Sequence, residues 1–322
     1  MPPVEERTRI GCLVRTVLPL LAAGALAAGL VACGGSGSGT TSTRAAASLP
    51  GSGKPPVTFG TQSVTEQVLI GQLYQQALEA RGFTVALKQN IGSTQIADQA
   101  LRSRQIDLYP AYVGVFETAV ARDATRYASA EGTFTAGQDY ARAHGFRLLP
   151  MTRFSTIDAL VVLPDYARAH RLRAVGGLAA IRGLKLGAPP EFRRREAGLR
   201  GLARIYGIRD VDFAPLTVGL QYQALNDGQV DVADVLTTDG QLQSGRYVVL
   251  ADPRHVFGFQ NVTPVVSRRV LRAEGPAFAA TLDAVSRALT TSAMQRMNAA
   301  VALNGKSPAD VAQQFLQAVG LV

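Results

Sequence analysis

Short apolar runs alternate with amphipathic segments of helical length from Val57 onward, and this alternation restricts the chain to the α/β class. Ser63 and Glu66 have the spacing of a capping box, which predicts where the first helix begins. The predicted strands and helices of this first unit are, in order, 57–59, 66–81, 83–87, 95–104 and 106–109. They form a βαβαβ unit, in which the strands are largely parallel.

The same alternation returns in a second unit. Its predicted strands and helices are, in order, 184–188, 191–206, 211–213, 221–226 and 230–236. A strand over 262–266 then precedes a helical block over 282–319, which must pack on one of the units. Two similar lobes follow from this pattern.

Two facing lobes of this kind form a cleft, because ligands of open α/β sheets bind at the loops that leave the carboxyl ends of the strands. The loops that we expect to border the cleft are 61–65, 92–94, 109–115, 237–240 and 257–261. Their residues are polar, small or aromatic.

The first residues predict export. Arg7, Arg9 and Arg15 precede an uncharged apolar run over 17–32, which is the pattern of a secretory signal. The run is shorter than the ~20 residues of a membrane-spanning helix. It ends at Cys33 in a sequence that resembles the bacterial lipobox, which implies cleavage before Cys33 and acylation of that residue. The alternative is an uncleaved anchor helix.

We therefore expect residues 1–32 to be a signal peptide and the protein to lie on the extracytoplasmic face of the bacterial cell membrane, held there by a lipid anchor. Residues 33–56 are rich in Gly, Ser, Thr, Ala and Pro, which predicts a flexible tether. Cys12 and Cys33 are the only cysteines, so the exported chain has no disulfide and depends on its hydrophobic core.

The formal net charge of +9 is compatible with a protein that binds nucleic acid. Its densest cluster, 193–195, lies beside Glu191 and Glu196 in the predicted helix 191–206, which is typical of a solvated helix face. We expect no nucleic-acid partner, and attraction to an anionic membrane surface only as a secondary effect.

The sequence offers little chemistry for catalysis. Its three histidines are far apart and form no metal-binding or triad pattern, so we expect no metal, no cofactor and no enzyme. Asp231, Asp234 and Asp239 flank one predicted strand. Alternation puts Asp231 on the face opposite Asp234, and we expect both to end strands or cap helices.

Several separated blocks, in the right order, resemble the glycine betaine, choline and osmoprotectant binding proteins of ABC importers. Among them are GTQSVTEQ at 60–67 and FGFQNVTP at 257–264. The remaining blocks are 92–114, 191–207, 219–240 and 297–320. The resemblance covers the chain from Val57 to Val322.

This resemblance implies a type II periplasmic-binding-protein fold, with two lobes joined by a two-strand hinge and a ligand cleft between them. Lobe I would comprise 57–153 plus 256–322, and lobe II would comprise 154–255. The resemblance also implies a monomer that captures a small-molecule solute and delivers it to an ABC permease with its ATPase. The alternatives are a ligand-sensing binding protein for a signalling partner and an anchored α/β enzyme.

Members that bind quaternary ammonium groups typically surround them with tyrosines, since aromatic faces attract a cation that cannot donate hydrogen bonds. The resemblance retains one such position, Tyr112. The other cage positions fall at Asp158, Leu236 and Gln260, so three aromatic walls are missing. A shifted alignment would let Phe259 supply one of them.

Arg195 matches an arginine that helps betaine-binding relatives hold the substrate carboxylate, a task suited to a bidentate guanidinium. The alternative is an ordinary position on the basic helix face. A carboxylate at Asp158 favours a cation with N–H donors. We therefore expect an amine-bearing or zwitterionic solute in preference to a fully methylated betaine. Further residues in the matching loops either face the cleft or cap local structure: Gln62, Thr94, Tyr222, Thr238 and Asp239.

Overall fold

The structure is a computed structural model that describes residues 48–322. The predicted signal peptide, Cys33 and the first part of the predicted tether lie outside these residues. Within 48–322, no helix is both long and apolar enough to cross a bilayer.

The described end of the predicted tether is attached to the body of the protein. The Gly51 N–H donates to the Arg81 carbonyl at 2.9 Å, and the Lys54 ammonium donates to the Ala273 carbonyl at 2.9 Å. A Cβ at Gly51 would lie 2.3 Å from the Phe83 backbone nitrogen, so this close approach requires glycine. The prediction of a flexible tether as far as residue 56 is therefore wrong for residues 51–54.

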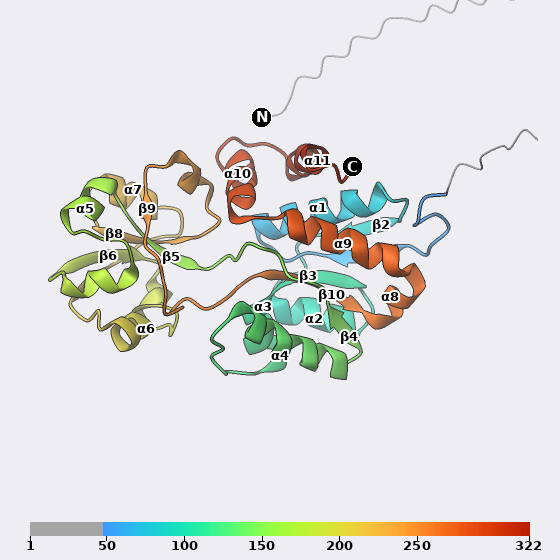
Figure 1. The fold of residues 1–322 in the computed structure, drawn as a ribbon, viewed down its shortest axis with the longest axis horizontal. Helices are drawn as coiled ribbons and strands as arrows, with labels where there is room; N and C mark the ends of the chain where they lie inside the picture. The colour runs from blue at the N-terminus through green and yellow to red at the C-terminus, as the bar shows by residue number, and fades with distance from the viewer. Residues whose placement is uncertain (1–47) are drawn as a thin grey trace, which may run out of the picture. The chain divides into compact units, whose positions relative to one another are not determined.

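The first lobe is built on a five-stranded sheet in the order β2-β1-β3-β10-β4 (Figure 1). Strand β1 is parallel to β2 and β3, whereas β10 is antiparallel to β3 and β4. The strands are β1 (Val57–Gly60), β2 (Val85–Lys88), β3 (Leu108–Tyr112), β4 (Phe146–Leu148) and β10 (Val262–Ser267). Because β10 comes from late in the chain, distant segments complete this sheet.

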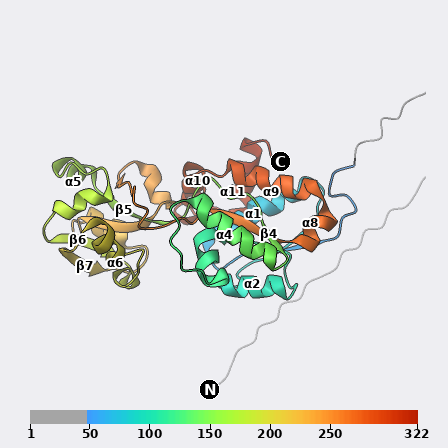
Figure 2. The ribbon, with the colours of Figure 1, turned by 60° about the horizontal axis from the view of Figure 1, so that its bottom comes forward.

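Helices cover both faces of this sheet, and the predicted C-terminal block resolves into three of them. Helix α1 contacts α9 and α11, which lie beside it in Figures 1 and 2. Leu69 and Leu73 of α1 are buried in one core with Phe278, Leu282 and Leu316. The segments are α1 (Thr65–Glu79), α2 (Thr94–Arg102), α3 (Val113–Val115), the π-helical η1 (Phe116–Ala121), α4 (Ala130–Ala143), α8 (Arg268–Glu274), α9 (Pro276–Ala288), α10 (Thr291–Ala302) and α11 (Pro308–Ala318).

The second lobe repeats the plan with a sheet in the order β7-β6-β8-β5-β9. Strand β6 is parallel to β7 and β8, whereas β5 is antiparallel to β8 and β9. Its strands are β5 (Asp158–Val162), β6 (Leu184–Ala188), β7 (Val211–Pro215), β8 (Val232–Leu236) and β9 (Val248–Val249). Its helical segments are α5 (Pro164–Ala169), η2 (Val175–Ala180), η3 (Pro190–Arg193), α6 (Leu199–Gly201), η4 (Leu202–Tyr206), α7 (Gln221–Asn226) and η5 (Gly240–Ser244).

Two chain segments connect the lobes, one between β4 and β5 and one between β9 and β10. They pair with each other: Ser155 and Asn261 form an antiparallel bridge. The Gln260 N–H also donates to the Ser155 hydroxyl at 2.8 Å. The two crossings therefore form one short paired ribbon between the lobes.

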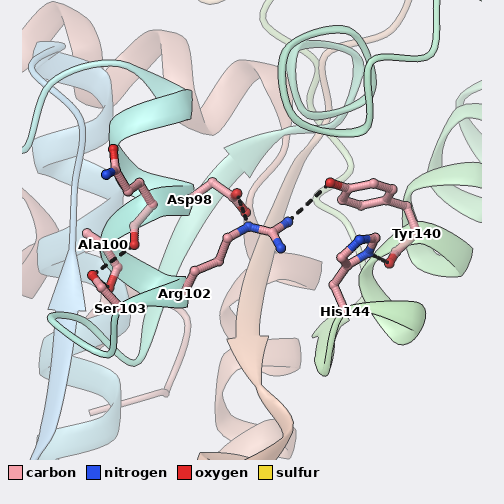
Figure 3. Close-up of polar contacts among 7 residues, drawn as sticks. Asp98, Ala100, Arg102, Ser103, Tyr140 and His144 are labelled. Atoms are coloured by element: carbon pink, nitrogen blue, oxygen red, sulfur yellow. Dashed lines mark hydrogen bonds and ion pairs between the residues drawn. The ribbon is translucent and has the colours of Figure 1, made fainter.

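Arg102 fastens α2 to α4 in the first lobe (Figure 3). Its Nε donates to Asp98 at 2.6 Å, and its Nη2 donates to the Tyr140 hydroxyl at 3.2 Å. The Tyr140 ring stacks on His144 with 4.1 Å between centroids. His144 thus packs on the Tyr140 ring, and its Nδ1 lies 2.8 Å from the Tyr140 carbonyl oxygen.

The predicted capping box at the start of α1 is wrong. No side chain caps this helix, whose preceding residue is Val64. Glu66 lies in the first turn and is buried, with its carboxylate directed at other elements. A buried carboxylate needs several hydrogen-bond donors, and the donors to Glu66 come from segments outside α1.

The predicted helix over 191–206 is right only for 199–206, where α6 continues directly into η4. The first half forms the 3₁₀ turn η3 and an irregular stretch. A Cβ at Gly198 would lie 2.2 Å from the Phe192 carbonyl oxygen, and one at Gly201 would lie 2.0 Å from that of Glu196. This close backbone packing interrupts the helix and places Arg195 in a turn.

Candidate ligand-binding site

A cavity of about 270 Å³ opens on the second lobe. It lies where β6 and β8 reach their carboxyl ends and where the antiparallel strand β5 begins. This is the sheet edge at which α/β folds bind ligands. Its lining residues are Asp158, Pro189, Glu191, Arg195, Val218, Gly219, Gln221, Tyr222, Asp234, Val235, Leu236, Asp239 and Gln241.

One arginine and two aspartates form the charged centre of the cavity. The Arg195 Nη2 lies 3.0 Å from Asp158 Oδ2 and 3.9 Å from Asp234 Oδ2. The Arg195 side chain keeps 40% of its surface exposed, against 15% for Asp158 and 4% for Asp234. The guanidinium carbon also lies 5.4 Å from the centre of the Phe192 ring. Arg195 is therefore positioned mainly by groups of its own lobe.

Two polar atoms of this centre lack hydrogen-bond partners among the described residues. These atoms are Asp234 Oδ1 and Arg195 Nε, and both are buried. A buried polar atom without a partner costs free energy, and such atoms in a cavity mark a place where a ligand can bind.

The pKa of Asp234 is raised to about 9, chiefly by burial and then by the nearby charge of Asp158, while Arg195 opposes the shift. Burial also raises the pKa of Asp158, against the attraction of Arg195. Burial raises the pKa of Asp239, although the hydrogen bonds that its carboxylate accepts oppose the shift. The cavity therefore holds acidic groups for which a nearby cation would favour the ionised form.

A second polar pair borders the cavity. The Tyr222 hydroxyl donates to Asp239 Oδ2 at 3.0 Å, and the Leu236 N–H donates to the same oxygen at 3.1 Å. Tyr222 lies at the start of α7, after the loop that follows β7. Asp239 is thus oriented from two sides.

The cavity brings together five of the ten predicted binding residues: Asp158, Arg195, Tyr222, Leu236 and Asp239. The other five lie elsewhere. Gln62 Nε2 donates to Thr94 Oγ1 at 3.1 Å inside the first lobe, and Gln260 Oε1 accepts from the Val115 N–H at 3.0 Å. Tyr112 and Thr238 lie at the junction between the lobes, described below.

The expectation for Asp234 is wrong. It lies within β8, ends no strand and caps no helix. In antiparallel pairing it faces Leu160 while Leu236 faces Asp158, so these side chains share one face of the sheet. Asp231 precedes β8, does not line the cavity, and accepts from the Lys185 N–H at 3.0 Å.

Sequence reasoning also missed the lining residues of two loops. Glu191 follows β6, and Val218 with Gln221 follows β7. Both loops leave carboxyl ends of parallel strands, so the rule applied to the other loops would have found them.

Glu66 was missed as well, and it joins several elements at the lobe junction. Its Oε1 accepts from the Tyr112 hydroxyl at 2.8 Å and from the Thr156 hydroxyl at 2.7 Å. Its Oε2 accepts from the Asn298 amide at 2.9 Å, and that amide also donates to the Thr238 carbonyl at 2.9 Å. Glu66 thus connects α1, β3, α10 and the first crossing segment.

Helix α10 holds the loop that supplies Asp239. Gln295 Nε2 donates to the Thr237 carbonyl at 2.8 Å. A Cβ at Gly240 would lie 2.5 Å from the Ala299 Cα, so η5 and α10 are in direct backbone contact. The cavity rim is therefore mechanically linked to the other lobe.

The part of the chain that the structure describes contains no group of three or more His, Cys, Asp or Glu side chains placed to hold a metal ion. The arrangement as a whole suits non-covalent binding of a small charged molecule.

Comparison with known proteins gives a match to one family model, the substrate binding domain of ABC-type glycine betaine transport systems, over residues 55–318. The glycine-betaine-binding protein of Pseudomonas aeruginosa is 30% identical over 271 residues, which cover 80% of this chain and 86% of the relative. The carnitine transport binding protein OpuCC of Listeria monocytogenes is 25% identical and covers 84% of this chain and 88% of the relative.

Solved structures agree. The crystal structure of a glycine betaine/carnitine/choline ABC transporter superposes with a TM-score of 0.77 at 26% identity, covering 82% of this chain and 99% of that one. Apo YehZ from Escherichia coli superposes with a TM-score of 0.73 at 25% identity, covering 83% and 99%. The expected fold class, with two sheet-and-helix lobes, is confirmed.

Proposed function

The chain belongs to the family of substrate-binding domains of ABC-type glycine betaine transport systems, and from this premise we propose that it captures a small amine-bearing, zwitterionic or quaternary-ammonium solute. It is a substrate-binding protein of an ABC importer, like the relatives that match it. The finer parts of the proposal are the solute class, the residues that bind it, delivery to a separate permease with its ATPase, and the lipid anchor.

The observation that carries the solute class is the charged cavity of the second lobe. It combines buried carboxylates, one guanidinium and apolar walls at the carboxyl edge of a sheet. Such a mixture fits a small organic molecule with a localised positive charge.

Capture and release follow from rotation of the lobes about the paired crossing segments. Lobe I, assigned to 57–153 plus 256–322, would close over lobe II, assigned to 154–255. On closure, Tyr112, Gln62, Thr94, Gln260 and Thr238 are proposed to approach the solute. Ligand binding favours the closed state only by its differential affinity for the two states.

Uptake tests this proposal. We would reconstitute the full chain with its permease and ATPase in liposomes and measure ATP-dependent uptake of a radiolabelled solute that the protein binds. Uptake should require the binding protein, and the solute should be recovered chemically unchanged. Equal uptake without the binding protein, or recovery of a modified solute, would contradict the proposal.

A separate experiment tests the anchor. Cells given a labelled fatty acid should incorporate it into the wild-type chain and not into Cys33→Ser, with Cys12→Ser as the matched control. Labelling of both variants would show that the lipid anchor at Cys33 is wrong.

A further inference from the structure

We propose that the solute is an organic cation that carries N–H donors and no carboxylate, and that Arg195 is a positioning residue instead of an anchor for the solute. This inference rests on the proposed function, whose solute class it narrows. The juxtaposition of Arg195 with Asp158 and Asp234 carries it.

The charge of the cavity is the first argument. Its lining includes four acidic side chains, those of Asp158, Glu191, Asp234 and Asp239, and one cation, Arg195. Burial keeps a proton on Asp234 in the free protein, and a bound cation favours release of that proton, whereas a solute carboxylate would oppose ionisation of these acids. Glu66 of the other lobe adds negative charge near Asp239.

The engagement of Arg195 is the second argument. Its Nη2 faces Asp158 at 3.0 Å and Asp234 at 3.9 Å, while its planar group lies near the Phe192 ring. An arginine that anchors a solute carboxylate needs free, parallel N–H groups directed at the solute. Here two carboxylates of the protein already engage Nη2, so Nη2 and the buried, unpartnered Nε do not form a free parallel pair of donors.

The distribution of acceptors and rings is the third argument. Asp234 Oδ1 lines the cavity side of β8, is buried, and accepts no hydrogen bond among the described residues. An N–H donor can satisfy this oxygen and a methylated nitrogen cannot. Tyr222 is the one aromatic residue among the described lining residues, so the walls do not form the aromatic cage that a quaternary ammonium group requires.

The test uses four small compounds that separate the two features. Glycine has N–H donors and a carboxylate, glycine betaine has only the carboxylate, ethanolamine has only the donors, and choline has neither. A fifth compound, 1,5-diaminopentane, provides a longer body with donors. Binding to the full chain in mild detergent is measured by titration calorimetry and by the shift of the unfolding midpoint.

Ethanolamine and 1,5-diaminopentane should bind at least tenfold more tightly than choline, and glycine should bind more weakly than ethanolamine. Tighter binding of choline, glycine betaine or glycine, or no binding by either amine at 10 mM as a rough upper limit, would overturn the inference. Permease-dependent uptake of choline or glycine betaine but of neither amine would leave the proposed function intact and overturn the inference, whereas binding of an amine without its permease-dependent uptake would leave the inference intact and contradict transport.

Variants test the individual groups. Asp234→Asn should weaken binding of 1,5-diaminopentane at least tenfold, while its matched control Asp231→Asn, which lies outside the cavity, should change it less than twofold. Arg195→Gln should change the affinities for glycine and ethanolamine by the same factor, because no solute carboxylate contacts the guanidinium. A loss of affinity for glycine that exceeds the loss for ethanolamine would assign the arginine to a solute carboxylate.

Discussion

The two lobes share one plan of strands and helices but differ in how their polar side chains are used. In the first lobe, predicted binding residues bond to other protein groups, as Gln62 does to Thr94 and Tyr112 does to Glu66. In the second lobe, Asp158, Asp234 and Arg195 line an open cavity, where Asp234 Oδ1 and Arg195 Nε have no hydrogen-bond partner among the described residues. From this difference we propose that the second lobe makes the primary contact with the solute and that the first lobe closes over it.

The largest expected effect is a loss of solute affinity, and it distinguishes the second lobe from the first. Asp158→Asn should weaken binding of 1,5-diaminopentane by about 1.5 to 3 kcal/mol, since a hydrogen bond to a charged group is lost. Titration calorimetry measures the loss, and Thr94→Val in the first lobe is the control. A greater loss in Thr94→Val would reverse the assignment of the primary site.

The next effect concerns the junction. Glu66→Ala leaves the Tyr112, Thr156 and Asn298 donors without their shared acceptor, so the free energy of unfolding should fall by about 2 kcal/mol. Urea denaturation measures it, with Glu79→Ala at the exposed end of the same helix as the control. Equal stability of both variants would show that Glu66 does not hold the junction.

A pH titration compares buried acids of the two lobes. The pKa of Glu117 in the first lobe is raised to about 7 by burial and by Asp123, and that of Asp234 in the second is raised to about 9. Asp158, Asp239, Glu191 and Arg195 are the charged groups that face Asp234. Both acids hold their protons in the folded protein at pH values where the unfolded chain has lost them, so stability falls as the pH rises.

Between pH 7 and 9 the free energy of unfolding should still fall as the pH rises, because Asp234 keeps its proton there. The slope for this one proton is at most about 1.4 kcal/mol per pH unit. Asp234→Asn should reduce the slope in that range, and Glu117→Gln should reduce it below pH 7. Urea denaturation across the pH series checks both. An unchanged slope in Asp234→Asn would mean that Asp234 ionises at an ordinary pH.

The smallest expected effect is that of Tyr112→Phe. It removes one hydrogen bond to Glu66 and keeps the ring, so the free energy of unfolding should fall by about 1 kcal/mol and solute affinity should change little. Denaturation and calorimetry on the same samples check this. A large loss of affinity with normal stability would place Tyr112 in the primary site.

Much of the fold was predictable from sequence. The strand 184–188 and the helix 221–226 match the structure residue for residue, because side-chain periodicity and local breakers determine such elements. The helix predicted over 191–206 forms only from 199 onward, because close backbone packing at Gly198 and Gly201 overrides local propensity in its first half. Five of the ten predicted binding residues line the cavity. The loops after β6 and β7, which also line it, were overlooked.

The sequence by itself determined the class of fold, the two lobes and the family, since these follow from periodic patterns and from motifs read along the chain. Only the tertiary structure decided that Arg195 meets Asp158 and Asp234, and that Glu66 accepts from Asn298 instead of capping its own helix. The physical reason is that ion pairs and buried hydrogen bonds depend on distances between segments remote in sequence, and packing of the sheets and helices sets those distances.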